Sequence, residues 1–491
     1  MMVSWIRTGL DFIPMRYLLT ILGFLLTFVA STTKYAIGIA ITEMVSVKVN
    51  FNNISFNDPN ACPMQFTDQI IDQFEEGEFD WDERTQGLIF SALYWSYVTM
   101  QIPFGLLVER FGPRYILIFS VFLSTSSYLL TPLVTVNLGS NGLIVTRFIM
   151  GFGLAAIYPS INILLSHWAP PLERSKLGGL IFVGENIGII MSMALSGLIL
   201  GNSKGNWPLL FYVYGSFGVV WLILWYFLGY DSPSVHPHIS NKEKKYLENV
   251  LNHNSRKKVL FTPWKEMVTS LPLWATLLAQ IGHDWGMITI VTELPKYMKS
   301  VLHFEIEANG YLSAFPYLSM TIIAILSGWF SDFLLEKKYF SITVVRKIFT
   351  TVAAVGPAIG ILGASFSGCN QILVTIMFTL GMGCMGFFYP SLGVNTLDLS
   401  PNYSGTLMGV IAYGSVGGIL SPYLVGVLAP DSTMMQWRLV FWIAVAFLII
   451  SNIIYLFFGS GEVQSWNEPD SQKNIKRNGQ KEEIQDTQMG V

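Results

Sequence analysis

The chain has few charged residues for its length. Only 12% of its 491 residues are Asp, Glu, Lys or Arg, whereas 52% are hydrophobic. A soluble domain needs more charge than this to cover its surface, so the composition excludes a soluble enzyme or binding module and indicates an integral membrane protein. The net charge of −3 is too small to indicate a partner.

Cysteine and catalytic motifs are also scarce. The three cysteines, Cys62, Cys369 and Cys384, are widely separated, so we expect neither a disulfide framework nor a CxxC metal site. Phosphate loops, zinc motifs and nucleophile elbows are missing from suitable contexts, so we expect no catalytic residues, no bound metal and no cofactor. The basic residues of 230–269 are interpreted as orientation charge, not as a nucleic-acid site.

Long apolar segments recur along the chain and predict the fold. We expect an all-α integral membrane protein with twelve transmembrane helices in two six-helix halves, 17–229 and 270–459. The first segment is too long for the hydrophobic part of a signal peptide. Residues 1–16 form the predicted amino-terminal segment, 230–269 a linker, and 460–491 a disordered tail. The predicted helices lie near 17–45, 86–108, 114–134, 142–166, 175–200, 207–229, 270–298, 308–334, 346–366, 370–397, 404–428 and 435–459.

An internal repeat supports the two halves. Tyr158-Pro159-Ser160 recurs 231 positions later as Tyr389-Pro390-Ser391. Pro170 and Gly178 recur at the same offset, as Pro401 and Gly409. Transporters built from two parallel repeats place such equivalent helix ends on either side of a central substrate path.

The distribution of Lys and Arg predicts the orientation. Most of them lie in segments on the same side as the amino terminus, so both termini should be cytoplasmic. The acidic loop 46–85 carries the sequon Asn53-Ile54-Ser55 and should be extracellular or luminal, with Asn53 either glycosylated or an unused surface residue. The short amino-terminal segment has no clear acidic dileucine signal, which favours the plasma membrane over lysosomes or vesicles. We expect a monomer in the lipid bilayer.

Two loops resemble the paired signature of the major facilitator superfamily. One runs from Gly105 to Arg114, and the other begins at Gly328 and contains Asp332. We expect the two glycines to let helices approach closely, and the charges to form a latch that breaks and reforms as the halves move. The alternative is that each charge is simply solvated. The predicted latch comprises Gly105, Glu109, Arg110, Arg114 and Asp332.

A narrower resemblance lies in the segment Trp168 to Leu177, WAPPLERSKL. It is similar to the anion and phosphate carriers that include sialin, the vesicular glutamate transporters and insect phosphate cotransporters, with the insect branch nearer. The resemblance implies secondary active transport of a small anion, inorganic phosphate or an organic acid, by alternating access with sodium or a proton co-transported. A gradient-independent facilitator or exchanger, and a non-transporting sensor on a carrier fold, remain alternatives.

Ionisable residues inside predicted helices cost roughly 2.5–3.5 kcal/mol each to insert and so mark candidate functional sites. Lys34 stands where the family has a substrate-binding Arg, Arg147 matches a family Arg, and His283 stands where glutamate carriers have an Arg. Each could instead have a structural partner, which for Arg147 would be Glu185 or a backbone carbonyl. Tyr97 and Tyr317 are further candidates for the substrate path, although either could be a packing residue.

The proton relay that the resemblance implies is missing. Proton-coupled relatives carry Glu, Glu and His where this chain has Met150, Leu154 and Asn162. None of these three can carry a proton, and Phe90, which replaces a His of the glutamate carriers, argues against glutamate as substrate. We therefore expect Glu185 to be the coupling acid, with Asp284 as the alternative.

Overall fold

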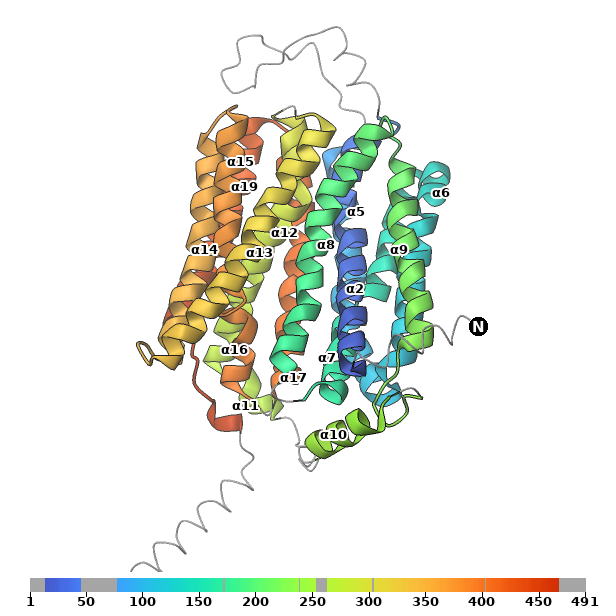
Figure 1. Cartoon of the computed structure of the whole chain (residues 1–491). Coiled ribbons are helices and arrows are strands. Elements are labelled where there is room, and N and C mark those ends of the chain that lie inside the picture. Colours follow the sequence, from blue (N-terminus) through green and yellow to red (C-terminus); the bar gives the residue numbers. More distant parts are fainter. Residues whose placement is uncertain are drawn as a thin grey trace, which may run out of the picture.

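The computed structural model describes residues 14–45, 77–170, 173–237, 239–252, 263–302, 304–401 and 403–467. The Asn53 sequon and most of the predicted acidic loop lie outside these residues. The described chain is folded into helices that run side by side, with the first half at the right of Figure 1 and the second half at the left.

Each half contributes six membrane spans, several of them built from two shorter helices. The first half contains α2 (Met15–Tyr35) with α3 (Ile37–Met44), α5 (Glu83–Phe111), α6 (Pro113–Leu154) with α7 (Ile157–Trp168), α8 (Arg174–Asn202) and α9 (Trp207–Leu228). The second half contains α12 (Leu271–Ser300), α13 (Ile306–Glu336), α14 (Ile342–Phe366), α15 (Gln371–Met385) with α16 (Leu392–Leu399), α17 (Ser404–Ile411) with α18 (Gly417–Leu428), and α19 (Met434–Phe458).

The number of spans follows from length as well as hydropathy. Among the described residues, 9 segments are long and apolar enough to cross a membrane, and one of them, Pro113–Trp168, has 56 residues. A straight helix of that length would reach about 80 Å, well beyond one bilayer. It turns at Gly139 (φ 61°), and Ser127 donates a hydrogen bond across the two arms to the Thr146 carbonyl at 2.6 Å. This turn makes the segment two spans, and helices α5 and α12, which also cross the bundle, bring the number of spans to twelve. The predicted fold class is confirmed.

The two halves are in close contact at one end of the bundle. We name this end, where Met44, Lys299 and Cys369 lie, the Cys369 face, and the opposite end, with Met15 and Phe458, the termini face. A Cβ atom on Gly87 of α5 would lie 2.4 Å from the Pro422 carbonyl oxygen of α18, and one on Gly197 of α8 would lie 2.8 Å from the Gly310 Cα of α13. Only glycine permits these two helix crossings.

Several spans are interrupted partway along their length. The first is broken at Ala36, between α2 and α3, and the fourth at Ala155–Ala156, between α6 and α7. The tenth passes through the 3-10 turn η1 (Gly386–Phe388) and the eleventh through η2 (Ala412–Val416). Irregular backbone at membrane depth is tolerated where it is buried in protein or lines a polar path, so these breaks indicate where the functional groups lie.

The linker contains helices, and the start of the tail is more ordered than predicted. The linker contains α10 (Asn241–Asn252) and α11 (Trp264–Val268), and the buried Glu243 carboxylate accepts hydrogen bonds from the backbone N–H groups of Met15 and Arg16 at 2.9 and 3.3 Å. The prediction of disorder from residue 460 is wrong for 460–467, because Gln464 N–H bonds to the Leu399 carbonyl at 2.9 Å and Trp466 is only 8% exposed. Contacts with distant segments order residues 460–467, and the local polar sequence gave no sign of these contacts.

Cysteine pairing also differs from expectation. Cys369 is disulfide-bonded, whereas Cys384 is a free thiol. The expectation that the chain lacks a disulfide is therefore wrong, because separation along the chain does not fix separation in space.

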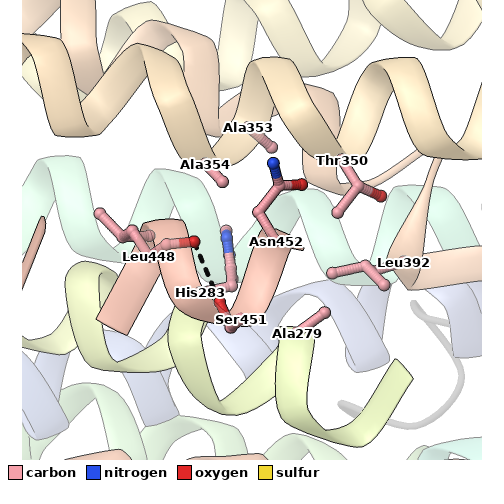
Figure 2. A pocket seen from close by; sticks show the side chains of 9 residues that line it. All are labelled: Ala279, His283, Thr350, Ala353, Ala354, Leu392, Leu448, Ser451 and Asn452. Carbon is pink, nitrogen blue, oxygen red and sulfur yellow. Dashed lines mark hydrogen bonds between the residues drawn. The ribbon is translucent and has the colours of Figure 1, made fainter. Parts of the chain in front are cut away.

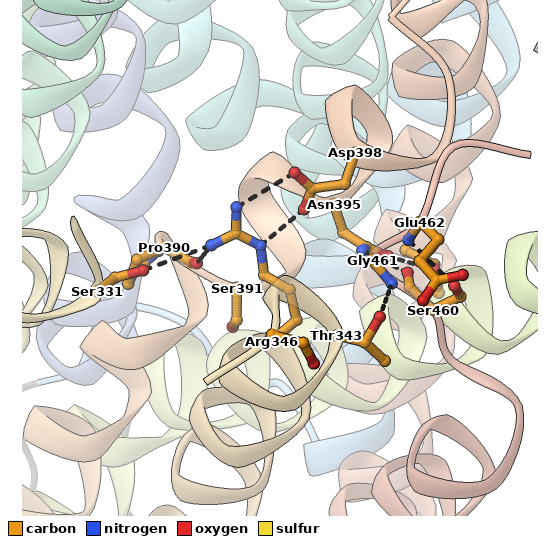
Figure 3. A network of polar contacts seen from close by, with 12 residues as sticks. Ser331, Thr343, Arg346, Pro390, Ser391, Asn395, Asp398, Ser460, Gly461 and Glu462 are labelled. Carbon is orange, nitrogen blue, oxygen red and sulfur yellow. Dashed lines mark hydrogen bonds and ion pairs between the residues drawn. The ribbon is translucent and has the colours of Figure 1, made fainter. Parts of the chain in front are cut away.

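A buried ionic network holds the termini face of the second half together. Arg346 of α14 forms a two-pronged ion pair with Asp398 of α16 at 2.7 and 3.2 Å and also donates to the Pro390 carbonyl at 2.6 Å (Figure 3). Next to it, Asn395 donates to the Ser460 carbonyl at 2.8 Å, which attaches the tail. Planar two-pronged pairs of this kind fix geometry, so Arg346 holds α14 against α16, and Asn395 of α16 holds the first residue of the tail.

Candidate functional site

A lysine surrounded by aromatic rings lies where the first span is broken. The Lys34 ammonium lies 4.9 Å from the ring centres of both Tyr35 and Tyr94 and 5.1 Å from that of Tyr97. Ring faces stabilise a cation without neutralising it. Within the described chain no carboxylate lies within 4 Å of this ammonium, so its positive charge remains available.

Arg147 lies directly beside Lys34. Its side chain is 4% exposed, and its Nη1 donates to the Lys34 carbonyl at 3.1 Å. A backbone carbonyl was one of the two structural alternatives for this residue. The other, an ion pair with Glu185, does not occur in the part of the chain that is described, and the Nε group has no hydrogen-bond partner there. A buried guanidinium with an unused donor is unusual, because such groups are normally fully paired.

Two acids approach the same region from α8 and α12. Asp284 accepts a hydrogen bond from Gln280 at 2.8 Å and lies within electrostatic range of both Lys34 and Glu185. Neither acid has an ion pair among the residues described, and both are only partly buried. The structure thus brings together two cations and two acids from four helices, a combination that can bind an anion together with a cation.

The predicted tyrosines lie close to the charged cluster. Tyr97 of α5 is 6% exposed, and its ring meets that of Tyr94 edge-on at 6.4 Å. Tyr317 of α13 is fully buried, lies within electrostatic range of Tyr94, and keeps its hydroxyl unbonded within the described structure. The second half therefore contributes an unbonded hydroxyl near Tyr94, one of the rings around Lys34.

Two further tyrosines escaped the sequence prediction of the site. Tyr158 stacks on Phe182 of α8 at 6.0 Å, and Tyr389 donates to Asn186 of α8 at 3.0 Å. Both lie within electrostatic range of Glu185. They occupy equivalent positions in the Tyr-Pro-Ser repeat, and this repeat was the sequence signal that could have placed both of them at the site. The repeat brings one tyrosine from each half to the same acid.

His283 lies apart from this cluster. Its ring stacks on Phe388 at 3.9 Å and faces a small pocket within the second half, lined also by Thr350 and Asn452 (Figure 2). Its Nδ1 has no hydrogen-bond partner among the described residues. A role for His283 in substrate binding stays a prediction, and the geometry around Lys34 does not require it.

The stripe that lacks proton carriers is packed as expected for apolar residues. Met150 and Leu154 are 1% and 4% exposed and belong to the main hydrophobic core. Phe90 is fully buried in the same core, whereas Asn162 is exposed. Met150, Leu154 and Asn162, the three positions of the relay on α6 and α7, therefore carry no side chain that can bind a proton.

The predicted latch stays a prediction, because its charged residues form no ion pair within the described chain. Glu109, Arg110 and Asp332 are exposed and have no ion pair among the described residues. A Cβ atom on Gly105 or Gly328 would meet nothing within 4 Å, so the expected close helix approach at these glycines is wrong for this conformation. The Arg114 guanidinium lies over the Tyr230 ring at 4.0 Å, and its backbone N–H donates to Asp231 at 2.7 Å. The halves are tightly packed at the Cys369 face and loosely packed around these glycines.

Twelve spans in two similar halves, with charged and unpaired polar groups where the spans are broken, define a membrane carrier. A family model described as "Major Facilitator Superfamily" matches residues 23–415. The chain is 38% identical to a "Putative inorganic phosphate cotransporter" of Drosophila ananassae over 82% of this chain and 85% of that protein. It is 35% identical to human sialin over 92% of this chain and 90% of that protein, and 33% identical to vesicular glutamate transporter 3 of Danio rerio over 94% and 76%.

Solved structures agree with the fold. A bacterial homolog of the human lysosomal transporter Spinster matches with a TM-score of 0.66 at 14% identity, over 91% of this chain and 97% of that chain. The xylose transporter XylE from E. coli matches with a TM-score of 0.64 at 13% identity, over 90% and 96%. The chain belongs to the major facilitator superfamily, and within it to the family of sialin, the vesicular glutamate transporters and the insect phosphate cotransporters. It is a transporter, not an enzyme.

Proposed function

We propose that this protein is a secondary active transporter of small anions, either inorganic phosphate or an organic acid, that works by alternating access with a co-transported cation. The observation that carries the proposal is the group of unused donors around Lys34. Its ammonium has no carboxylate within 4 Å, Arg147 has an unbonded Nε, and Tyr317 has an unbonded hydroxyl, all judged within the described chain. Unpaired donors in the interior of the bundle favour an anionic ligand.

The coupling cation is a proton or sodium, held by Glu185 or Asp284. The two negative charges of these acids balance the two positive charges of Lys34 and Arg147 when no substrate is bound. A bound anion therefore adds negative charge to the site, and a cation that binds with it offsets that charge. Tyr158 and Tyr389 contribute hydroxyl groups close to Glu185. The names of the relatives, a phosphate cotransporter and sialin among them, support both substrate classes.

A gradient-independent exchanger is the second candidate. The buried Met150 and Leu154 favour it, because they occupy the positions that carry acids in proton-coupled relatives. An exchanger would move the same anion through the same site without a net ion gradient. The non-transporting sensor has no specific support from the geometry.

The test uses the full chain purified into liposomes. Phosphate, urate, glucuronate, sialate and acidic amino acids are offered separately, with pH and sodium gradients imposed one at a time. We expect uptake of at least one anion to depend on one gradient. Uptake that needs no gradient supports the exchanger, and no uptake of any anion contradicts transport.

Lys34 provides the matched pair of variants. Lys34→Met removes the charge and should lower uptake by about tenfold or more, as expected for the loss of a charge-assisted hydrogen bond. Lys34→Arg keeps the charge, adds the two-pronged geometry, and should retain uptake. Equal uptake by both variants would contradict a substrate role for Lys34.

A further inference from the structure

A second buried acid lies away from the central cluster, at the Cys369 face. Glu293 of α12 is 2% exposed, one of the most enclosed carboxyl groups described. Its Oε1 accepts a hydrogen bond from Thr292 at 3.3 Å, and its Oε2 has no hydrogen-bond partner among the described residues. No step of the proposed transport cycle uses this residue.

Glu293 belongs to a cluster in which acids outnumber bases. Lys296 pairs closely with Glu83 at the start of α5, and its ammonium is 4.0 Å from Glu293 Oε2. The Glu83 carboxylate is also bonded by the Ser432 hydroxyl at 3.1 Å. The single ammonium is therefore committed to Glu83, and the three side chains are only 2–14% exposed. With both acids ionised, the cluster would hold one uncompensated negative charge out of water, which is strongly unfavourable.

No other described charge relieves this imbalance. On α3, which packs against the same stretch of α12, Glu43 is already paired one-to-one with Lys299. Asn309 of α13 donates to the Pro295 carbonyl at 2.7 Å, and Thr289 of α12 pairs with Ser421 of α18, so those helices contribute neutral groups. Arg84, beside Glu83, is exposed to solvent. The charges that act on Glu293 are Lys296 and Glu83.

The cluster also joins the two halves. Glu83 belongs to the first half, whereas Glu293, Lys296 and Ser432 belong to the second. A Cβ atom on Gly426 of α18 would lie 2.4 Å from the Glu83 carbonyl oxygen, so the halves touch at this point. Separation of the halves at the Cys369 face must break the Glu83 contacts and admit water to Glu293.

We propose that Glu293 is a proton-binding site that controls closure of the Cys369 face. A proton from water on that side binds the Glu293 carboxylate, which leaves a neutral cluster made of one acid, one ion pair and the serine. The halves then close over it. When the face opens, the proton returns to the water on the same side, so it is not carried across with the substrate. A metal ion is disfavoured because the Lys296 ammonium occupies the site.

This inference rests on the proposed alternating access but not on any particular substrate. Its test therefore measures conformation without substrate, by hydrogen exchange of the full chain in lipid nanodiscs at about pH 5 and about pH 8, corrected for intrinsic exchange rates. In the unmodified protein, protection of 37–44 and of the start of α5 should fall by about tenfold or more from acid to alkaline pH. Glu293→Gln should stay protected at both pH values.

Two further variants keep the result interpretable. Glu43→Gln breaks the balanced pair with Lys299, so protection should fall equally at both pH values while its pH dependence remains. Glu83→Gln leaves Lys296 free to pair with Glu293, so the pH dependence should disappear. If Glu293→Gln, folded as judged by its thermal transition, keeps the pH dependence of the unmodified protein, the proposal is overturned. The proposal is also overturned if Glu83→Gln keeps the pH dependence of the unmodified protein. Failure of every anion in the uptake panel would leave this result unaffected.

Discussion

At the scale of single residues, the central site is notable for groups that are not paired. Lys34 is surrounded by tyrosine rings, and Arg147 donates to a backbone carbonyl rather than to a carboxylate. Glu185 and Asp284 have no ion pair among the described residues. Charged groups that lack a protein partner are available to a ligand.

Glu185 provides the residue-scale prediction. Glu185→Gln keeps the size and polarity of the side chain but cannot bind a proton or a cation. We expect uptake driven by a pH or sodium gradient to be abolished, while exchange of labelled for unlabelled anion continues. Asp284→Asn is the matched variant. If gradient dependence is unchanged in Glu185→Gln and lost in Asp284→Asn, the coupling role moves to Asp284.

At the scale of elements, the contacts between helices report the conformation. On the Cys369 face, α5 and α18 touch at Gly87, and α8 and α13 touch at Gly197 and Gly310. At Gly105 and Gly328, by contrast, no atom lies within 4 Å of the position that an added methyl group would occupy. The breaks in the interrupted spans lie between these two ends of the bundle, and Lys34, Tyr158 and Tyr389 lie close to those breaks.

Gly87 and Gly105 form a matched pair on the same helix. Gly87→Ala places a methyl group against the Pro422 carbonyl, so it should open the Cys369 face and reduce protection from hydrogen exchange there by about tenfold, the effect of an overpacking cost of roughly 1–3 kcal/mol. Gly105→Ala meets no neighbour and should leave protection unchanged. Equal effects of the two substitutions would contradict the assignment of the closed face.

At the scale of the whole molecule, two observations agree on the proposed orientation. Lys and Arg are concentrated in the segments of the termini face, and the disulfide-bonded Cys369 lies at the opposite face. Disulfides persist in oxidising compartments, so the Cys369 face should be extracellular or luminal and both termini cytoplasmic.

This orientation predicts a simple labelling pattern. Antibodies to tags at residues 1 and 491 should stain cells only after permeabilisation. Glycosidase treatment should increase the gel mobility of the protein, and Asn53→Gln should remove that shift. Staining of the termini on intact cells would contradict the orientation. Staining at the cell surface through a tag placed on the Cys369 face tests the expected plasma membrane location.

The sequence by itself determined the class of this protein and the number of its spans. Long apolar segments must lie in lipid, and the repeat at 231 residues requires two similar halves, so both followed from local composition. It also identified Lys34, Arg147, Glu185 and Asp284, because ionisable residues within apolar segments are conspicuous. Their convergence could not be read from the sequence.

Only the tertiary structure decided which groups meet. Tyr158 and Tyr389 reach the same acid, His283 faces a separate pocket, and the start of the tail packs beneath α16, all through contacts between segments far apart in the chain. Glu293 lay within a predicted span without being singled out. Its surplus charge is visible only where Glu83 and Lys296 come together, because the cost of a buried charge depends on its neighbours in space.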